Sequence, residues 1–277
     1  MDKGFLRRLL FFVTLVITLV GTHKTLAEVS AQNNSVREFA SQKRLPGESW
    51  QQARERFYQQ WDRQFPMAWS RDNAESVAVP FSQLNHNKVV TWGSEDELLT
   101  GFFQVRDQRD LDDPLQAPIF KRRLTWLYPD DGCYARAAMM KKYLSGRGYT
   151  EPTRIFIFGS LEVQTDNSPS GSVTWWYHTA PVVRIGGQVY VFDPAINPQG
   201  PTPVRDWVMA QTSDIDDVKL SYCAPSTYHP GSSCDKPAEY EDAEALSTMK
   251  SFLRYEWDRQ IELNRDPAQI LGEQPPW

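Results

Sequence analysis

The chain has 277 residues, of which hydrophobic residues make up 40% and charged residues 23%. This composition excludes collagen-like, coiled-coil and wholly disordered chains, and the length is sufficient to bury a hydrophobic core without crosslinks. The formal net charge of −5 provides no broad basic surface, so we expect no nucleic-acid partner.

The first 27 residues have the pattern of a secretory signal peptide. Basic residues, among them Arg7 and Arg8, precede the apolar run Leu9–Val20, and a small-x-small cleavage site ends at Ala27. An uncleaved membrane anchor is the alternative, but twelve helical residues rise only about 18 Å, against a hydrocarbon core of about 30 Å. We therefore expect cleavage, no membrane span in the mature chain, and a secreted or periplasmic location.

Periodic apolar residues predict the helices and strands that follow. Residues 28–44 are polar and predict a loose linker. Helical spacing of apolar residues is found over 49–65, 95–103, 132–146, 204–211 and 238–263. Runs rich in β-branched and aromatic residues predict strands over 154–163, 173–185 and 188–193.

The order of these elements predicts an α+β fold. The helix over 132–146 precedes strands that pair antiparallel at the turn Gly186-Gly187, and we expect this helix to pack on their sheet. The charged run Asp107–Pro114 interrupts the pattern and predicts a boundary. The chain then divides into a signal peptide (1–27), a helical N-terminal region (28–115) and a C-terminal domain (116–277).

Three cysteines in an exported chain predict one disulfide and one free thiol. Cys223 and Cys234 lie 11 residues apart in a Pro/Ser/Gly-rich loop and are the natural pair. A zinc site that combines them with His229 is the alternative, but its spacing matches no common pattern of zinc ligands. We therefore expect no metal and a free thiol at Cys133.

Cys133 lies at the predicted start of the helix over 132–146, with Asp131 as the N-cap. A helix N-terminus favours the nucleophilic thiolate, and backbone N–H groups near Gly132 can face a developing oxyanion. Asp130 and Asp131 oppose the thiolate, because a nearby carboxylate disfavours a second anion. The alternative interpretation of Cys133 is a buried, inert side chain.

A histidine and an aspartate are expected to meet on the paired strands. The two-residue turn at Gly186-Gly187 makes His178 and Asp193 diagonal neighbours on one face, whereas a three-residue turn would direct Asp193 to the other face. Trp176 is expected on the face of His178, where it either lines an acyl site or simply packs. Together with Cys133, the pair predicts a triad of nucleophile, base and orienting carboxylate.

The segments around these three residues resemble bacterial protein-glutaminases. The resemblance rests on Tyr128–Ala137 with its run Asp-Gly-Cys-Tyr-Ala-Arg-Ala, on Trp176–Ala180, and on Asp193-Pro194 followed by Gly200-Pro201. It implies a transglutaminase-like or papain-like core in which Cys133 is the nucleophile, His178 the base and Asp193 the orienting residue. It also implies a protein or peptide substrate that bears glutamine, no cofactor, and a pro-segment formed by residues 28 to about 115. An integral part of the core is the alternative for that region.

The sequence as a whole predicts a secreted thiol amidohydrolase that deamidates protein-bound glutamine through a thioester on Cys133. A transglutaminase-like acyltransferase, in which a lysine amine intercepts the same thioester, and a cysteine peptidase are the enzymatic alternatives. A binding protein that keeps the fold without the chemistry is the alternative from another class. The presence of all three residues of the predicted triad argues against that last possibility.

Overall fold

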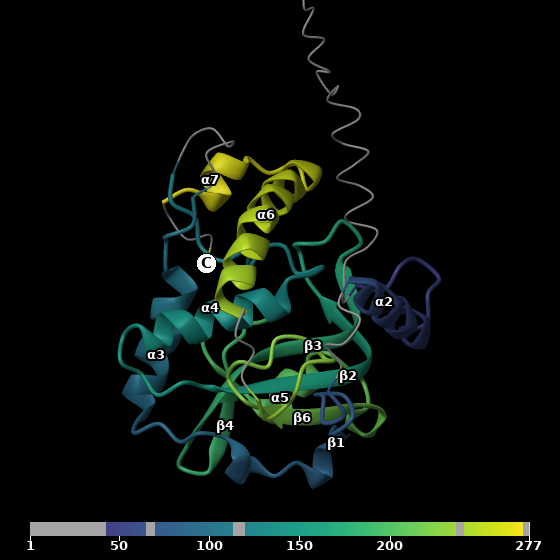
Figure 1. Ribbon diagram of the computed structural model, residues 1–277. Helices are drawn as coiled ribbons and strands as arrows, with labels where there is room; N and C mark the ends of the chain where they lie inside the picture. Colours follow the sequence, from purple (N-terminus) through teal and green to yellow (C-terminus); the bar gives the residue numbers. More distant parts are fainter. Residues whose placement is uncertain (1–42, 65–69, 113–119, 237–240, 274–276) are drawn as a thin grey trace, which may run out of the picture. The chain divides into compact units, whose positions relative to one another are not determined.

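The computed structural model describes residues 43–64, 70–112, 120–236, 241–273 and 277 (Figure 1). The chain divides into two compact units, residues 1–39 and 40–277, and the structure below is that of the second unit. The predicted signal peptide and almost all of the predicted linker lie outside the described residues. No helix in the described ranges has the length and apolarity that crossing a membrane requires.

A six-stranded antiparallel sheet forms the centre of this unit. Its strands, in spatial order, are β1 (Val79–Pro80), β6 (Lys219–Cys223), β2 (Thr153–Gln164), β3 (Ser172–Ile185), β4 (Gln188–Val191) and β5 (Thr202–Pro203). Three of these strands match predicted ones. The interior strand β6 and the two-residue strands β1 and β5 were not predicted.

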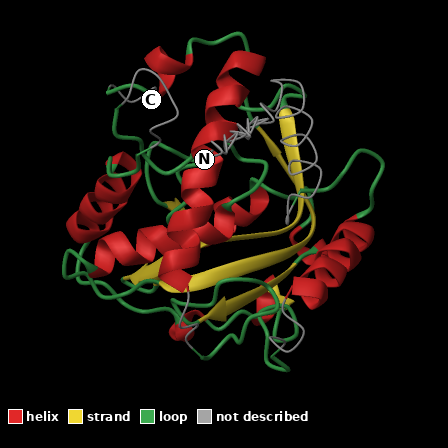
Figure 2. Cartoon of the chain, turned by 45° about the horizontal axis from the view of Figure 1, so that its top comes forward, coloured by secondary structure: helices red, strands yellow, loops and turns green. Residues whose placement is uncertain are grey.

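Six α-helices surround the sheet in the described ranges, together with three short 3-10 helices (Figure 2). The α-helices are α2 (Trp50–Gln64), α3 (Glu95–Asp107), α4 (Cys133–Ser145), α5 (Val204–Met209), α6 (Glu241–Glu262) and α7 (Pro267–Leu271). The 3-10 helices are η1 (Phe81–Gln83), η2 (His86–Lys88) and η3 (Ile215–Asp217). The predicted α+β class is confirmed.

The two faces of the sheet bury different clusters of apolar side chains, as the alternation along a strand requires. Phe156 and Phe158 of β2 belong to the cluster that also includes side chains of α3, α4 and α6. Ile155 and Ile157 belong to the opposite cluster, to which α5 contributes Trp207. Helix α4 therefore packs on one face of the sheet and α5 on the other.

A β-bulge in β2 changes the face of the sheet to which side chains of β3 point. The pairing register shifts between Phe158 and Leu161, around Gly159, whose φ of +148° favours glycine. Beyond this shift, Trp175 belongs to the α5-side cluster and Trp176 to the α4-side cluster. The uninterrupted alternation assumed in the sequence analysis had placed the two tryptophans the other way round.

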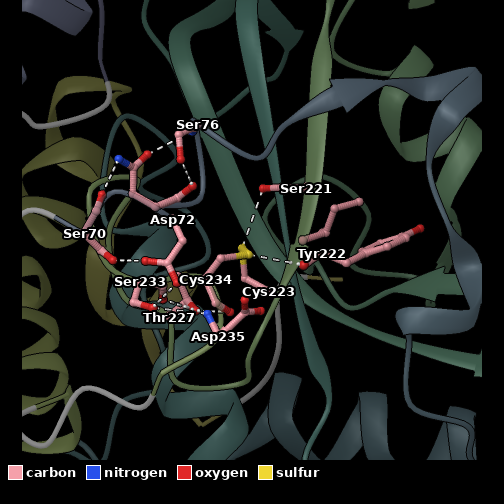
Figure 3. The surroundings of a disulfide bond; sticks show 12 residues. Ser70, Asp72, Ser76, Ser221, Tyr222, Cys223, Thr227, Ser233, Cys234 and Asp235 are labelled. Carbon is pink, nitrogen blue, oxygen red and sulfur yellow. Dashed lines mark hydrogen bonds between the residues drawn. A yellow bond between two sulfur atoms is a disulfide. The ribbon is translucent and has the colours of Figure 1, made fainter.

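The predicted disulfide between Cys223 and Cys234 is present, with the two Cα atoms 4.5 Å apart (Figure 3). It joins the end of β6 to the end of the following loop. Within that loop, the Thr227 hydroxyl donates to the carbonyl oxygen of Ser233 at 2.9 Å, and the backbone N–H of Cys234 donates to the carbonyl oxygen of Asp72 at 2.9 Å. The hydrogen bond to Asp72 connects the crosslinked loop to a segment that is distant in the sequence.

The described part of the N-terminal region contacts the same sheet. The Phe57 ring of α2 lies 5.3 Å from the Trp176 ring, centroid to centroid. Strand β1 pairs with β6, and the backbone of Lys43 forms an antiparallel bridge with Trp175. The domain boundary near residue 115 stays a prediction.

Candidate active site

Cys133 is the first residue of α4, and a glycine forms the helix start. Gly132, rather than the predicted Asp131, is the N-cap residue, with a φ of +89° and no side-chain capping bond. A Cβ atom at Gly132 would also lie 2.7 Å from the Phe252 ring, so both conformation and space require glycine. The Asp131 side chain instead accepts a hydrogen bond from the backbone N–H of Gly132 at 2.6 Å.

Arg136, one turn into α4, holds the loop that leads to Cys133. Its side chain is buried, and one terminal nitrogen donates to the carbonyl oxygens of Thr125, Tyr128 and Asp131 at 3.2, 3.2 and 2.8 Å. These three carbonyls span the loop before the helix. The guanidinium therefore fixes the approach to Cys133 and brings a positive charge close to its thiol.

The environment of Cys133 favours the neutral thiol. Burial raises the pKa of Cys133, and the carboxylates of Asp131 and Asp193 act in the same direction, while Arg136 and a backbone hydrogen bond from Thr179 lower it. The lowering expected from the helix start is outweighed by burial. Cys133 is only 1% exposed, so its thiol is shielded from solvent in this structure.

His178 and Asp193 form the predicted pair. Strands β3 and β4 pair from Ile185 with Gln188 to Val182 with Val191, which is the register of the predicted two-residue turn. The Nε2 atom of His178 lies 2.7 Å from Oδ2 of Asp193, and both residues are buried. Nδ1 of His178 is buried and makes no hydrogen bond among the described residues.

Two tryptophans stack on the His178 ring. The Trp175 ring lies 4.5 Å from it at an interplanar angle of 10°, and the Trp207 ring of α5 lies 5.6 Å from it at 26°. The indole N–H of Trp207 also donates to Oδ2 of Asp193 at 2.9 Å. Trp176, for which the sequence leaves both an acyl-site lining and simple packing open, packs against Phe57 and Phe158.

Asp193 remains ionised in spite of its burial. Desolvation raises the pKa of this carboxyl group, but the charge and hydrogen bond of His178, the hydrogen bond from Trp207 and the charge of Arg136 together lower it below the usual value. The buried carboxylate therefore has the charge that an orienting partner of an imidazolium needs.

Of the predicted triad, His178 and Asp193 are joined by a hydrogen bond, whereas Nδ1 of His178 makes no hydrogen bond to the Cys133 thiol. Cys133 instead forms a hydrogen bond with the backbone of Thr179, the residue after His178. His229 is buried, and its ring contacts that of Tyr134 at 4.9 Å. No cluster of potential metal ligands occurs in the ranges that the structure describes.

Trp175, Trp207 and Arg136 were not identified as parts of the site from the sequence. Strict alternation along β3 predicts that Trp175 and His178 point to opposite faces of the sheet. The β-bulge places the two side chains on the same face. Trp207 lies 14 residues after Asp193 in a separate helix, and no spacing rule links the two. Arg136 had a usable signal, because an arginine one helical turn after a nucleophile lies on the same helix face.

Comparisons with solved structures found protein-glutaminases, and 11 chains matched in all. A crystal structure of pro-protein-glutaminase shares 21% identity over 77% of this chain and 68% of its own, with a TM-score of 0.49. The A47Q2 mutant of pro-protein-glutaminase shares 23% identity over 61% of each chain, so about three fifths of that protein is matched, with a TM-score of 0.46. The NMR structure of protein-glutaminase from Chryseobacterium proteolyticum shares 21% identity over 68% of this chain and 94% of its own, with a TM-score of 0.46.

A comparison with curated proteins found no match. A comparison with protein families matched residues 99–211 to a family described as Glutaminase. The matched range begins in α3 and ends just after α5, so it includes Cys133, His178, Asp193 and Trp207. Residues 99–211 of this chain are therefore similar to the family described as Glutaminase.

Proposed function

We propose that the protein hydrolyses the side-chain carboxamide of protein-bound glutamine to glutamate and ammonia. The observation that carries this proposal is the buried His178–Asp193 pair at 2.7 Å, with the second imidazole nitrogen left without a hydrogen bond, beside a helix that begins at Cys133. The glutaminase match over residues 99–211 supports the carboxamide as the substrate group. The proposal also includes export of the protein, which the signal-peptide pattern of residues 1–27 supports.

In the first half-reaction, Cys133 transfers its proton to Nδ1 of His178, and the thiolate attacks the carboxamide carbon. Asp193 holds Nε2 of the imidazole and stabilises the imidazolium that forms. Backbone N–H groups at the start of α4, near Gly132, are the proposed donors to the oxyanion. The C–N bond then breaks, the imidazolium gives its proton to the departing nitrogen, and ammonia leaves a thioester on Cys133.

In the second half-reaction, water attacks the thioester carbon while His178 accepts one of its protons. The C–S bond breaks, the proton returns to the sulfur, and the product is glutamate with Cys133 restored. The same imidazole acts as a base in the attack steps and as an acid in the release steps. The reaction consumes one water and releases one ammonia, and it needs no group beyond those of this chain.

Ammonia release from a glutamine-containing protein tests the proposal. The wild type is expected to release ammonia and to add about one dalton per modified site, while Cys133→Ala and His178→Ala release none above background. Ammonia release by Cys133→Ala at the wild-type rate would contradict the proposal.

Transamidation is the second candidate, because it passes through the same thioester. Water is present at about 55 M, so an amine competes only where a channel desolvates and orients it. We expect a primary amine in millimolar amounts to leave the hydrolytic product unchanged. Efficient incorporation of the amine, or crosslinked substrate on a gel, would instead establish an acyltransferase.

A further inference from the structure

Both indoles that stack on His178 also donate a hydrogen bond, and each donates to a different part of the site. The Trp175 N–H donates to the carbonyl oxygen of Pro129 at 3.0 Å, in the loop before Cys133. The Trp207 N–H donates to Oδ2 of Asp193 at 2.9 Å. Both side chains are almost fully buried, at 1% and 0% exposed. Trp207 thus contacts the imidazole and the carboxylate at the same time.

We propose that Trp207 is a positioning residue for the reaction, which it serves by fixing the orientation of the Asp193 carboxylate toward His178. This inference rests on the proposed amidohydrolase function. Oδ2 of Asp193 accepts from both the indole of Trp207 and the imidazole of His178. Because one oxygen accepts from both donors, rotation of the carboxylate out of its plane would weaken both bonds together, and the indole therefore helps to hold the orientation that the imidazole needs.

Trp207 is suited to this role because its helix approaches the sheet from the face opposite to α4. Val204, Trp207 and Val208 of α5 are buried in the cluster on that face. The indole is therefore held by packing before it bonds to Asp193. A rigid donor whose side chain is locked by its surroundings is what a precisely oriented catalytic pair requires.

The charge balance around Asp193 gives the direction of the expected pH effect. The charged or titratable groups that act on Asp193 and Cys133 from α4 and its preceding loop are Arg136 and Asp131. On the α5 side, Trp207 contributes a neutral donor that lowers the pKa of Asp193. Removing this donor raises the pKa of the carboxyl group, so the orienting charge is lost at a higher pH.

The test compares Trp207→Phe with Trp175→Phe as the matched control. Each variant keeps an aromatic ring near His178 and loses one indole N–H, but only the first loses the donor to Asp193. The substrate is a blocked peptide that contains one glutamine. Trp207→Phe is expected to lower kcat about tenfold, because the variant loses a hydrogen bond to the charged carboxylate of Asp193. We expect KM to stay within about twofold and the acid limb of the pH profile to move to higher pH. Trp175→Phe is expected to keep the acid limb of the wild type.

A merely structural role for Trp207 predicts a different outcome. It would lower the midpoint of urea unfolding without moving the acid limb, and kcat per folded molecule would be unchanged. That result, or an acid limb shifted equally by both variants, would overturn the proposal.

A second measurement separates this inference from the proposed function. The rate of Cys133 alkylation by iodoacetamide, followed against pH in the wild type, Trp207→Phe, Trp175→Phe and His178→Ala, needs no substrate. If the wild type releases no ammonia, the proposed function fails, yet a pH dependence of alkylation altered by Trp207→Phe and not by Trp175→Phe still supports the positioning role. Identical alkylation profiles in wild type and Trp207→Phe would overturn it.

Discussion

At the scale of single residues, Arg136 combines a structural and an electrostatic effect. Its buried guanidinium donates to three loop carbonyls and lowers the pKa values of both Cys133 and Asp193. No carboxylate forms an ion pair with it among the described residues. Its charge is therefore not cancelled by a direct partner and acts on the side chains of Cys133 and Asp193.

Arg136→Gln is expected to impair both stability and activity. Buried carbonyls that lose their donor destabilise the folded state by about 3 kcal/mol in total, and loss of the positive charge raises the pKa of the Cys133 thiol further. Urea unfolding and the pH dependence of kcat/KM measure the two effects. Arg147→Gln, at an exposed position two residues beyond the end of the same helix, is the control and should change the unfolding free energy by less than about 0.5 kcal/mol. Equal stabilities of the two variants would contradict the assigned role.

At the scale of elements, the disulfide stabilises a loop that supports the start of α4. The loop between Cys223 and Cys234 carries Tyr228 and His229, whose rings lie 5.2 and 4.9 Å from the ring of Tyr134. Tyr134 directly follows Cys133 in α4. The crosslink is therefore coupled to the active site through one layer of aromatic side chains.

Replacing both disulfide cysteines by alanine should lower the unfolding free energy by about 3 kcal/mol, from the entropy of closing a loop of this length. Activity should fall as well, because the loop no longer holds Tyr134 in place. Thermal unfolding and ammonia release of Cys223→Ala/Cys234→Ala provide the measurements. A variant with the melting temperature and activity of the wild type would show that the loop is held without the crosslink.

The strands that sequence patterns predicted are those that pair with a neighbour along the chain, β2 with β3 and β3 with β4. The turn at Gly186-Gly187 sets the register of β3 and β4 locally, so the His178–Asp193 pair followed from counting residues. Strand β6 was missed, although Val218, Leu220 and Tyr222 alternate, because it pairs only with strands distant in sequence. The facing of Trp176 was wrong because a bulge in the neighbouring strand is not visible in the sequence of β3.

At the scale of the whole molecule, two parts of the N-terminal region make different contacts. Residues 43–64 contact the surroundings of the candidate site, through the ion pair of Lys43 with Asp130 and the packing of Phe57 on Trp176. Residues 70–112 belong to the core, since β1 extends the sheet and Phe102 of α3 is fully buried. Ala53 and Phe57 of α2 are buried in the same cluster as Phe102, so α2 also supports the fold. We propose that residues 43–64 in addition restrain the candidate site, because Lys43 pairs with Asp130 in the loop before Cys133.

Cleavage between α2 and residue 70 is therefore expected to raise activity, while cleavage within residues 113–119 lowers it. An introduced protease site at each position, with ammonia release and mass followed over time, distinguishes the two. The uncut form of each variant is the control. A loss of activity in step with the first cleavage would mean that α2 is an integral part of the enzyme.

Asp130 is a buried carboxylate that has two cationic partners. Its carboxylate is 1% exposed and divides its two oxygens between cations from opposite ends of the chain, Oδ1 to Lys43 and Oδ2 to Arg259 of α6, the latter at 2.5 Å. A buried carboxylate with a single partner would become an uncompensated charge when that partner departs, at a cost of about 3–5 kcal/mol. With Arg259 in place, the departure of Lys43 leaves Asp130 neutralised and the loop before Cys133 still anchored to α6.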